Sequence, residues 1–262
     1  VNLGKLDLPA SVALDAATSI TAGGAPNGVT ITAVAATAIN LVDTTPFEVT
    51  GSISITAKGA ITMNAKSVSG ALDVTSTEGS IALNDLTSAG ATTLSASTTI
   101  HAGITSNASG TTASGSEVHL ANLASNAGGL TITAGAVDLS SLASNASTAT
   151  INTATSISLG ALADAAANIV APAATSFVAA VLATSTGTID VADGAAITVK
   201  NLTTTGALVD FATMLTLTLL EQGDNLTFTG AASMTTLNYT GKLLYSDAMD
   251  QQTNVVTITN AG

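Results

Sequence analysis

The chain has 262 residues, of which 71 are Ser or Thr and only six are aromatic, with no Trp and no Cys. Six aromatic side chains are too few to fill a wide core, so we expect a thin core of Ala, Val, Ile and Leu, without disulfides or thiolate metal sites. Seventeen Asp and Glu against five Lys give a net charge of −12, which disfavours nucleic acid as a partner because phosphate binding needs a basic surface.

The first 50 residues are the least regular part of the pattern before the C-terminal end. Val29 with Ile31, and Ile39 with Leu41, alternate as short strands do. The segment TTPFE at 44–48 interrupts this alternation and is interpreted as an insertion. We therefore predict irregular coils or a cap over residues 1–50.

A repeat dominates residues 51–230. The sequence LASNA occurs at 123–127 and at 142–146, and ITSNA stands at 104–108, one further step of 19 residues before them. A pattern of two apolar residues separated by one residue, with a third apolar residue three positions later, recurs at steps of 18 to 20 residues. Its copies begin at residues 61, 81, 100, 118, 137, 157, 177 and 197. So constant a step is typical of the coil of a repeat protein.

A second alternating run precedes the copies. Its members are Leu72 with Val74, Leu130 with Ile132, Ile189 with Val191, and Leu226 with Phe228. Short strands joined by corners of Ala, Ser, Asn and Gly are too close together for crossover helices. The sequence thus predicts an all-β parallel β-helix (β-solenoid) of about a dozen coils, forming one domain over 1–262 with a C-terminal cap or contact segment at 231–262.

Two stretches also resemble a known group of proteins. GLTITAGAVDLSSLASN and GSISITAKGAITMNAKSVSG look like the ~20-residue repeats of filamentous haemagglutinin-type exoproteins, and they resemble the repeats of bacterial surface leucine-rich and receptor-L-like solenoids. The likeness covers roughly residues 51–230. It implies a right-handed winding and a secreted surface role, and it carries over no site residues.

The repeated Asn residues form the first candidate site. Asn107, Asn126 and Asn145 follow one another at 19-residue steps, so they would stack if this step is the coil length. Stacked amides hydrogen-bond along the stack and hold corners in register. We predict a structural ladder, with contact to a ligand as the alternative.

The two histidines form the second candidate. His101 and His119 each follow the first apolar residue of consecutive copies. Stacking would bring the imidazoles within ~5 Å of each other, close enough to share a transition-metal ion. Asp138 has the same place one copy later, too far along to join that ion. The alternative is two exposed histidines on a strand.

No other chemistry stands out. The chain has no Arg, and its lysines are scattered, so an acid-polysaccharide-cleaving site with a basic clamp is not expected. We predict no enzyme activity, no catalytic residue and no cofactor. The uncharged run 165–189 contains Asn168 and Pro172 and keeps the repeat in register, so no membrane insertion is expected.

Thr-X-Thr pairs raise the possibility of ice binding. They occur at 131/133, 148/150, 216/218, 227/229 and 257/259. The pairs do not recur in every copy or at one step, so the β-propensity of Thr is the simpler explanation.

Together these features favour an extracellular structural protein, exported with its signal already removed, that assembles end to end with copies of itself into a filament or surface layer. The alternative is an adhesin or a carbohydrate- or surface-binding module that uses a solenoid face and contacts cell-surface or matrix components. Clustered aromatics that would stack on sugars are lacking, which favours assembly. The expected assembly contacts are Tyr239, Tyr245, Met249, Val255, Val256 and Ile258.

A test of the register follows from the repeat. Leu123 and Leu142 should occupy equivalent inward positions, so Leu142→Asp should be strongly destabilising. Ser158 should lie outward and tolerate the same change.

Overall fold

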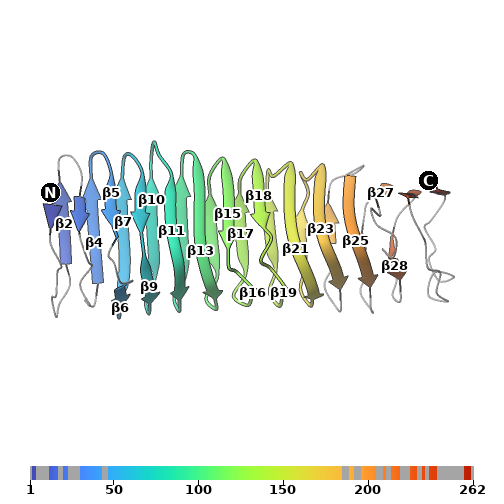
Figure 1. Cartoon of the computed structure of the whole chain (residues 1–262), viewed down its shortest axis with the longest axis horizontal. Helices are drawn as coiled ribbons and strands as arrows, with labels where there is room; N and C mark the ends of the chain where they lie inside the picture. Colours follow the sequence, from blue (N-terminus) through green and yellow to red (C-terminus); the bar gives the residue numbers. More distant parts are fainter. Residues whose placement is uncertain are drawn as a thin grey trace. The chain divides into compact units, whose positions relative to one another are not determined.

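The computed structural model of the chain describes residues 2–3, 12–16, 20–22, 30–42, 47–184, 189–191, 196–204, 209–210, 214–218, 225–228, 232–233, 236–240 and 257–260. These residues form an all-β parallel β-solenoid of about seven turns, and no helix occurs among them (Figure 1). The chain divides into two compact units, Val1–Ala134 and Gly135–Gly262.

The first unit contains strands of two sheets. Its first-sheet strands are β1 (Asn2–Leu3), β3 (Ile20–Ala22), β5 (Ile39–Leu41), β6 (Phe47–Val49), β8 (Ile61–Met63), β9 (Ala65–Val68), β11 (Ile81–Ser88), β13 (Thr99–Asn107), β15 (Glu117–Ala121) and β16 (Ser125–Asn126). Its second-sheet strands are β2 (Val12–Ala16), β4 (Thr30–Ala35), β7 (Ser52–Ala57), β10 (Leu72–Ser76), β12 (Thr92–Ala96), β14 (Thr111–Ser114) and β17 (Leu130–Thr133). Each coil contributes to both sheets.

The register of the first unit confirms the predicted step. Ile61 pairs with Ile81, Ile81 with Ile100, and Ile100 with Val118, all in parallel strands. Each of these side chains is buried, because alternate residues of a strand point to one face and only apolar residues occupy that face here. A row of like side chains therefore runs from coil to coil through the core. Burial of each such side chain stabilises the fold by roughly 1.5–3 kcal/mol.

The N-terminal region takes part in the same pattern. Ile39 pairs with Ile61, a step of 22 residues, which is longer than the later steps. Ile31 pairs with Ile53 of β7. The interpretation of TTPFE as an insertion is wrong at its end, because Phe47 begins strand β6 and pairs with Ala65 of β9. Val29 lies outside the described residues.

The second unit repeats this organisation. Its first-sheet strands are β18 (Ala136–Leu139), β19 (Ser144–Asn145), β21 (Ser156–Ala165), β23 (Ser176–Thr184), β25 (Ala196–Thr204), β27 (Met214–Thr218), β28 (Asn225–Phe228), β30 (Thr236–Thr240) and β31 (Thr257–Asn260). Its second-sheet strands are β20 (Ala149–Asn152), β22 (Ile169–Ala171), β24 (Ile189–Val191), β26 (Val209–Asp210) and β29 (Ala232–Ser233). The predicted starts pair again, Val137 with Ile157, Ile157 with Phe177, and Phe177 with Ile197.

One predicted grouping is wrong. Leu226 and Phe228 do not belong with the second-sheet run, because β28 pairs with the first-sheet strand β25, Leu202 opposite Leu226 and Thr204 opposite Phe228. Period-two alternation shows that a segment is a strand, but both sheets of a solenoid share that period. The alternation therefore could not show which sheet this strand joins.

Among the described residues, the structure contains no helix that could span a membrane. The prediction that residues 1–262 form a single domain stays a prediction.

Candidate functional sites

Two of the predicted ladder residues meet in the first unit. The Asn107 side chain donates a hydrogen bond from Nδ2 to Oδ1 of Asn126 at 2.6 Å, and both side chains are buried. The free oxygen of Asn107 accepts the N–H of Ala127 at 2.9 Å, and Oδ1 of Asn126 also accepts the N–H of Gly129 at 3.1 Å. The two amides thus join each other and bind the backbone of the second corner.

The local sequence explains these corners. Three residues after each Asn stands a glycine with positive φ, Gly110 at 92° and Gly129 at 97°. Only glycine adopts this backbone conformation without strain, so the chain can turn back at once. The N–H of Gly110 donates to the carbonyl of Asn107 at 2.9 Å, which closes the turn.

Asn145 has the same role in the second unit. Its side chain is fully buried. Its Nδ2 donates to the carbonyl of Ala167 at 2.8 Å and to that of Asn168 at 3.3 Å. The backbone of Ala167 in turn donates to the carbonyl of Asn145 at 2.9 Å, so this Asn joins two successive corners.

Burial separates the two readings of these Asn residues. Their exposed fractions are 2% for Asn107 and 0% for Asn126 and Asn145. A ligand in solution cannot reach amides that are this enclosed and that bind backbone groups. Since buried polar groups require hydrogen-bond partners, the arrangement favours the structural ladder over ligand contact.

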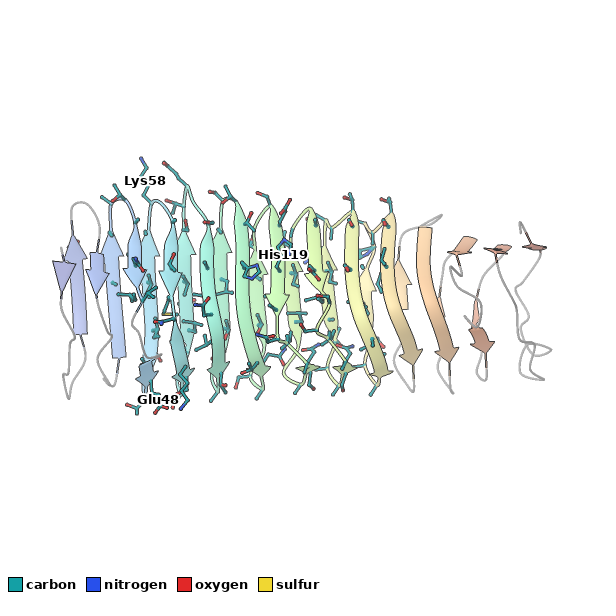
Figure 2. The ribbon with its side chains drawn as sticks, viewed as in Figure 1. Glu48, Lys58 and His119 are labelled. Carbon is teal, nitrogen blue, oxygen red and sulfur yellow. The ribbon has the colours of Figure 1, made fainter. Side chains whose placement is uncertain are left out.

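The predicted histidine pair also forms. His101 of β13 and His119 of β15 are directly opposite in register, and their ring centroids are 5.9 Å apart at an interplanar angle of 32°. His101 is exposed and 37% of the His119 side chain is accessible. Figure 2 shows His119 part-way along the strands, between the levels of Lys58 at one end and Glu48 at the other. Asp138 lies in the second unit and accepts the N–H of Ser140 at 2.9 Å.

A third acidic group lies beside the pair. Oε2 of Glu117 is 3.6 Å from Nε2 of His119. As the side chains stand, the described residues contain no group of three or more His, Cys, Asp or Glu that holds a metal ion.

The outer face of the second sheet carries a feature that sequence reasoning missed. In the first unit its outward positions align in two rows, nearly all Ser or Thr. The rows are Thr32, Ser54, Asp73, Thr93, Thr112 and Thr131, and Val34, Thr56, Thr75, Ser95, Ser114 and Thr133. A count of Thr pairs alone hides them, because Ser takes the place of Thr in several coils. Counting both hydroxyl residues at the coil step would have revealed the rows.

Two buried threonines face the other way. Thr92 and Thr111 are opposite each other in β12 and β14 and occupy the inward row that holds Leu72 and Leu130. Both are buried, and neither Oγ1 has a hydrogen-bond partner.

The expected assembly contacts fall mostly outside the described residues. Tyr245, Met249, Val255 and Val256 are among those that the structure does not describe. Tyr239 lies in β30 and Ile258 in β31, where Ile258 pairs with Leu237 and Tyr239 with Asn260.

Comparisons of the chain with protein-family models, with curated proteins and with solved structures find no match. Arguments about function therefore depend on the geometry of this chain and on the resemblance of its repeats.

Proposed function

We propose that this chain is an extracellular structural protein, a β-solenoid subunit that assembles end to end with copies of itself into a filament or surface layer. The observation that carries the proposal is the equivalence of the coils. In each unit, successive strands pair in parallel at nearly constant register with like residues opposite each other. The edge of one coil is therefore a template for any other coil, including one from a second copy.

Strand edges provide the means of assembly. Among the described strands, β2 pairs with β4 only and β31 with β30 only. An unpaired edge presents a row of N–H and C=O groups that readily bind another strand. A joint between two different edges is heterologous and does not close on itself, so it propagates into a filament.

The finer points of the fold belong to the same proposal. We infer about a dozen coils for the whole chain, since pairing at a similar step extends from β1 to β31. A right-handed winding is the expectation for parallel strands joined by crossovers within one sheet. The proposal includes no catalytic activity, no cofactor, no nucleic-acid partner and no membrane insertion.

Proline scanning of β31 tests the proposal. Successive residues of a strand direct their N–H groups to opposite sides, so of Ile258 and Thr259 one faces β30 and the other faces away. Proline removes the N–H. Assembly of the full chain and of Ile258→Pro and Thr259→Pro should be followed by light scattering and negative-stain electron microscopy, with hydrogen exchange reporting β31.

We expect one proline variant to keep the protection of β30 and β31 while losing assembly. The matched control is Asn84→Ala, an exposed position on β11, which should assemble normally. A full chain that stays monomeric at all concentrations, or assembly that persists in both proline variants, would refute an end-to-end joint at this edge.

A second candidate function is an adhesin or surface-binding module, and the two hydroxyl rows favour it. Hydroxyl groups both donate and accept hydrogen bonds, and neighbouring strands space them ~4.8 Å apart. Such a face matches a hydroxyl-rich carbohydrate surface. Retention on insoluble polysaccharide should then be lost in Thr93→Lys/Thr112→Lys and kept in Asn84→Lys; retention equal in both variants, or absent in the full chain, would argue against this function.

A further inference from the structure

The outward face of β13 and β15 gathers three side chains that can bind a metal. His101 and His119 are adjacent across the two strands, with ring centroids 5.9 Å apart. Glu117 precedes His119 by two residues, so it lies on the same face of β15. Its Oε2 is 3.6 Å from Nε2 of His119.

These separations are close to those of a tetrahedral metal site. Bonds of ~2.1 Å at the tetrahedral angle hold two donor atoms ~3.4 Å apart, near the distance between Glu117 and His119. Each bound imidazole has its centroid ~3.2 Å from the ion, so two rings on one tetrahedral ion have centroids ~5.2 Å apart. Small side-chain rotations of His101 and Glu117 close the remaining difference.

The surroundings allow those rotations. His101 and Glu117 are exposed, and the residue opposite His101 on the other side, Ala82 of β11, has only a methyl group. The backbone under the site is held on both sides of β13 by parallel pairing with β11 and β15. The strands thus fix the origins of the ligands while their ends stay adjustable.

We propose that His101, His119 and Glu117 form a binding site for a divalent transition-metal ion, with water completing the coordination. Two imidazoles and a carboxylate are the ligand set that zinc takes with an open fourth position. Imidazole nitrogen suits zinc, copper and nickel, whereas magnesium and calcium take oxygen ligands. The site is independent of the proposed assembly, since its residues lie far from β2 and β31 in the chain.

Calorimetric titration of the full chain with zinc chloride tests the site. We expect one equivalent of zinc to bind, and His101→Asn and His119→Asn each to weaken binding by at least about tenfold. Glu117→Gln, which keeps the shape of the side chain, should weaken it less. Glu48→Gln, a carboxylate elsewhere on the same unit, should bind as the unaltered chain does.

A second readout identifies the ligands directly. Zinc should shift the nitrogen resonances of both imidazoles in long-range ¹⁵N NMR spectra, and magnesium should not. Circular dichroism checks that each variant keeps its fold. Equal zinc affinity in the His101→Asn/His119→Asn double variant, imidazole resonances unmoved by zinc, or no heat of binding would overturn the proposal.

Discussion

Two stacked pairs of polar side chains are buried in the first unit, and they differ in one respect. Asn107 and Asn126 bind each other and the backbone of a corner. Thr92 and Thr111 lie opposite each other in an inward row, and their hydroxyl oxygens have no hydrogen-bond partner. Both pairs are equally enclosed.

The difference shows what each part of a coil requires. At the corner the chain turns, and its N–H and C=O groups cannot all pair with the next coil, so an amide that supplies both a donor and an acceptor is useful there. Within the strand the backbone groups already pair along the sheet, and an inward side chain has only apolar neighbours to meet. A hydroxyl at that position is tolerated for its shape, and its desolvation lowers stability.

The largest expected effect comes from a charge that has no partner. Leu142 is buried and Ser158 is only partly so, and Leu142→Asp should destabilise the fold by about 4 kcal/mol or more. Ser158→Asp should change stability by about 0.5 kcal/mol or less. Chemical denaturation followed by circular dichroism, with hydrogen exchange to locate the weakened coils, measures both. Equal tolerance at the two positions would mean that the assigned register is wrong.

Loss of a satisfied amide should come next. Asn126→Leu keeps the size of the side chain but leaves Nδ2 of Asn107 and the N–H of Gly129 without this acceptor, so we expect a loss of about 3 kcal/mol. The double variant Asn107→Leu/Asn126→Leu should lose less than the sum of the single variants, because neither amide then strands the other. Asn84→Leu is the exposed control; a loss at Asn126 no larger than at Asn84 would contradict a structural ladder.

The unsatisfied pair should respond in the opposite direction. Thr92→Val replaces the hydroxyl by a methyl group of similar size in a row that already contains Leu72 and Leu130, and it should stabilise the fold by about 1 kcal/mol. Thr93→Val, one residue away on the outward face, should have little effect. Destabilisation by Thr92→Val in denaturation experiments would show that its hydroxyl makes a useful contact.

The sequence was sufficient for the coil step but not for all of its content. Inward positions of the first sheet accept almost only apolar residues, so the row through Ile61, Ile81 and Ile100 was legible from spacing alone, and LASNA revealed the corner amides. Thr92 gave no comparable signal, because Thr is common on outward strand positions. Only its alignment with Leu72 shows that it points inward. Leu226 was assigned to the wrong sheet because both sheets share one alternation.

The smallest expected effect concerns an ion pair that is shorter than many neutral contacts and yet exposed. Nζ of Lys66 is 2.9 Å from Oε1 of Glu48, with 67% and 56% of the two side chains accessible, and Glu48 lies at the end of the strands (Figure 2). Water screens such a pair, and holding two long side chains together costs entropy, so Lys66→Gln should lower stability by about 0.5 kcal/mol or less. Because salt weakens exposed pairs, the difference between Lys66→Gln and the unaltered chain should vanish at high ionic strength, whereas the effect of Asn126→Leu should persist. A loss for Lys66→Gln that matched Asn126→Leu and resisted salt would show that burial is not what separates the two contacts.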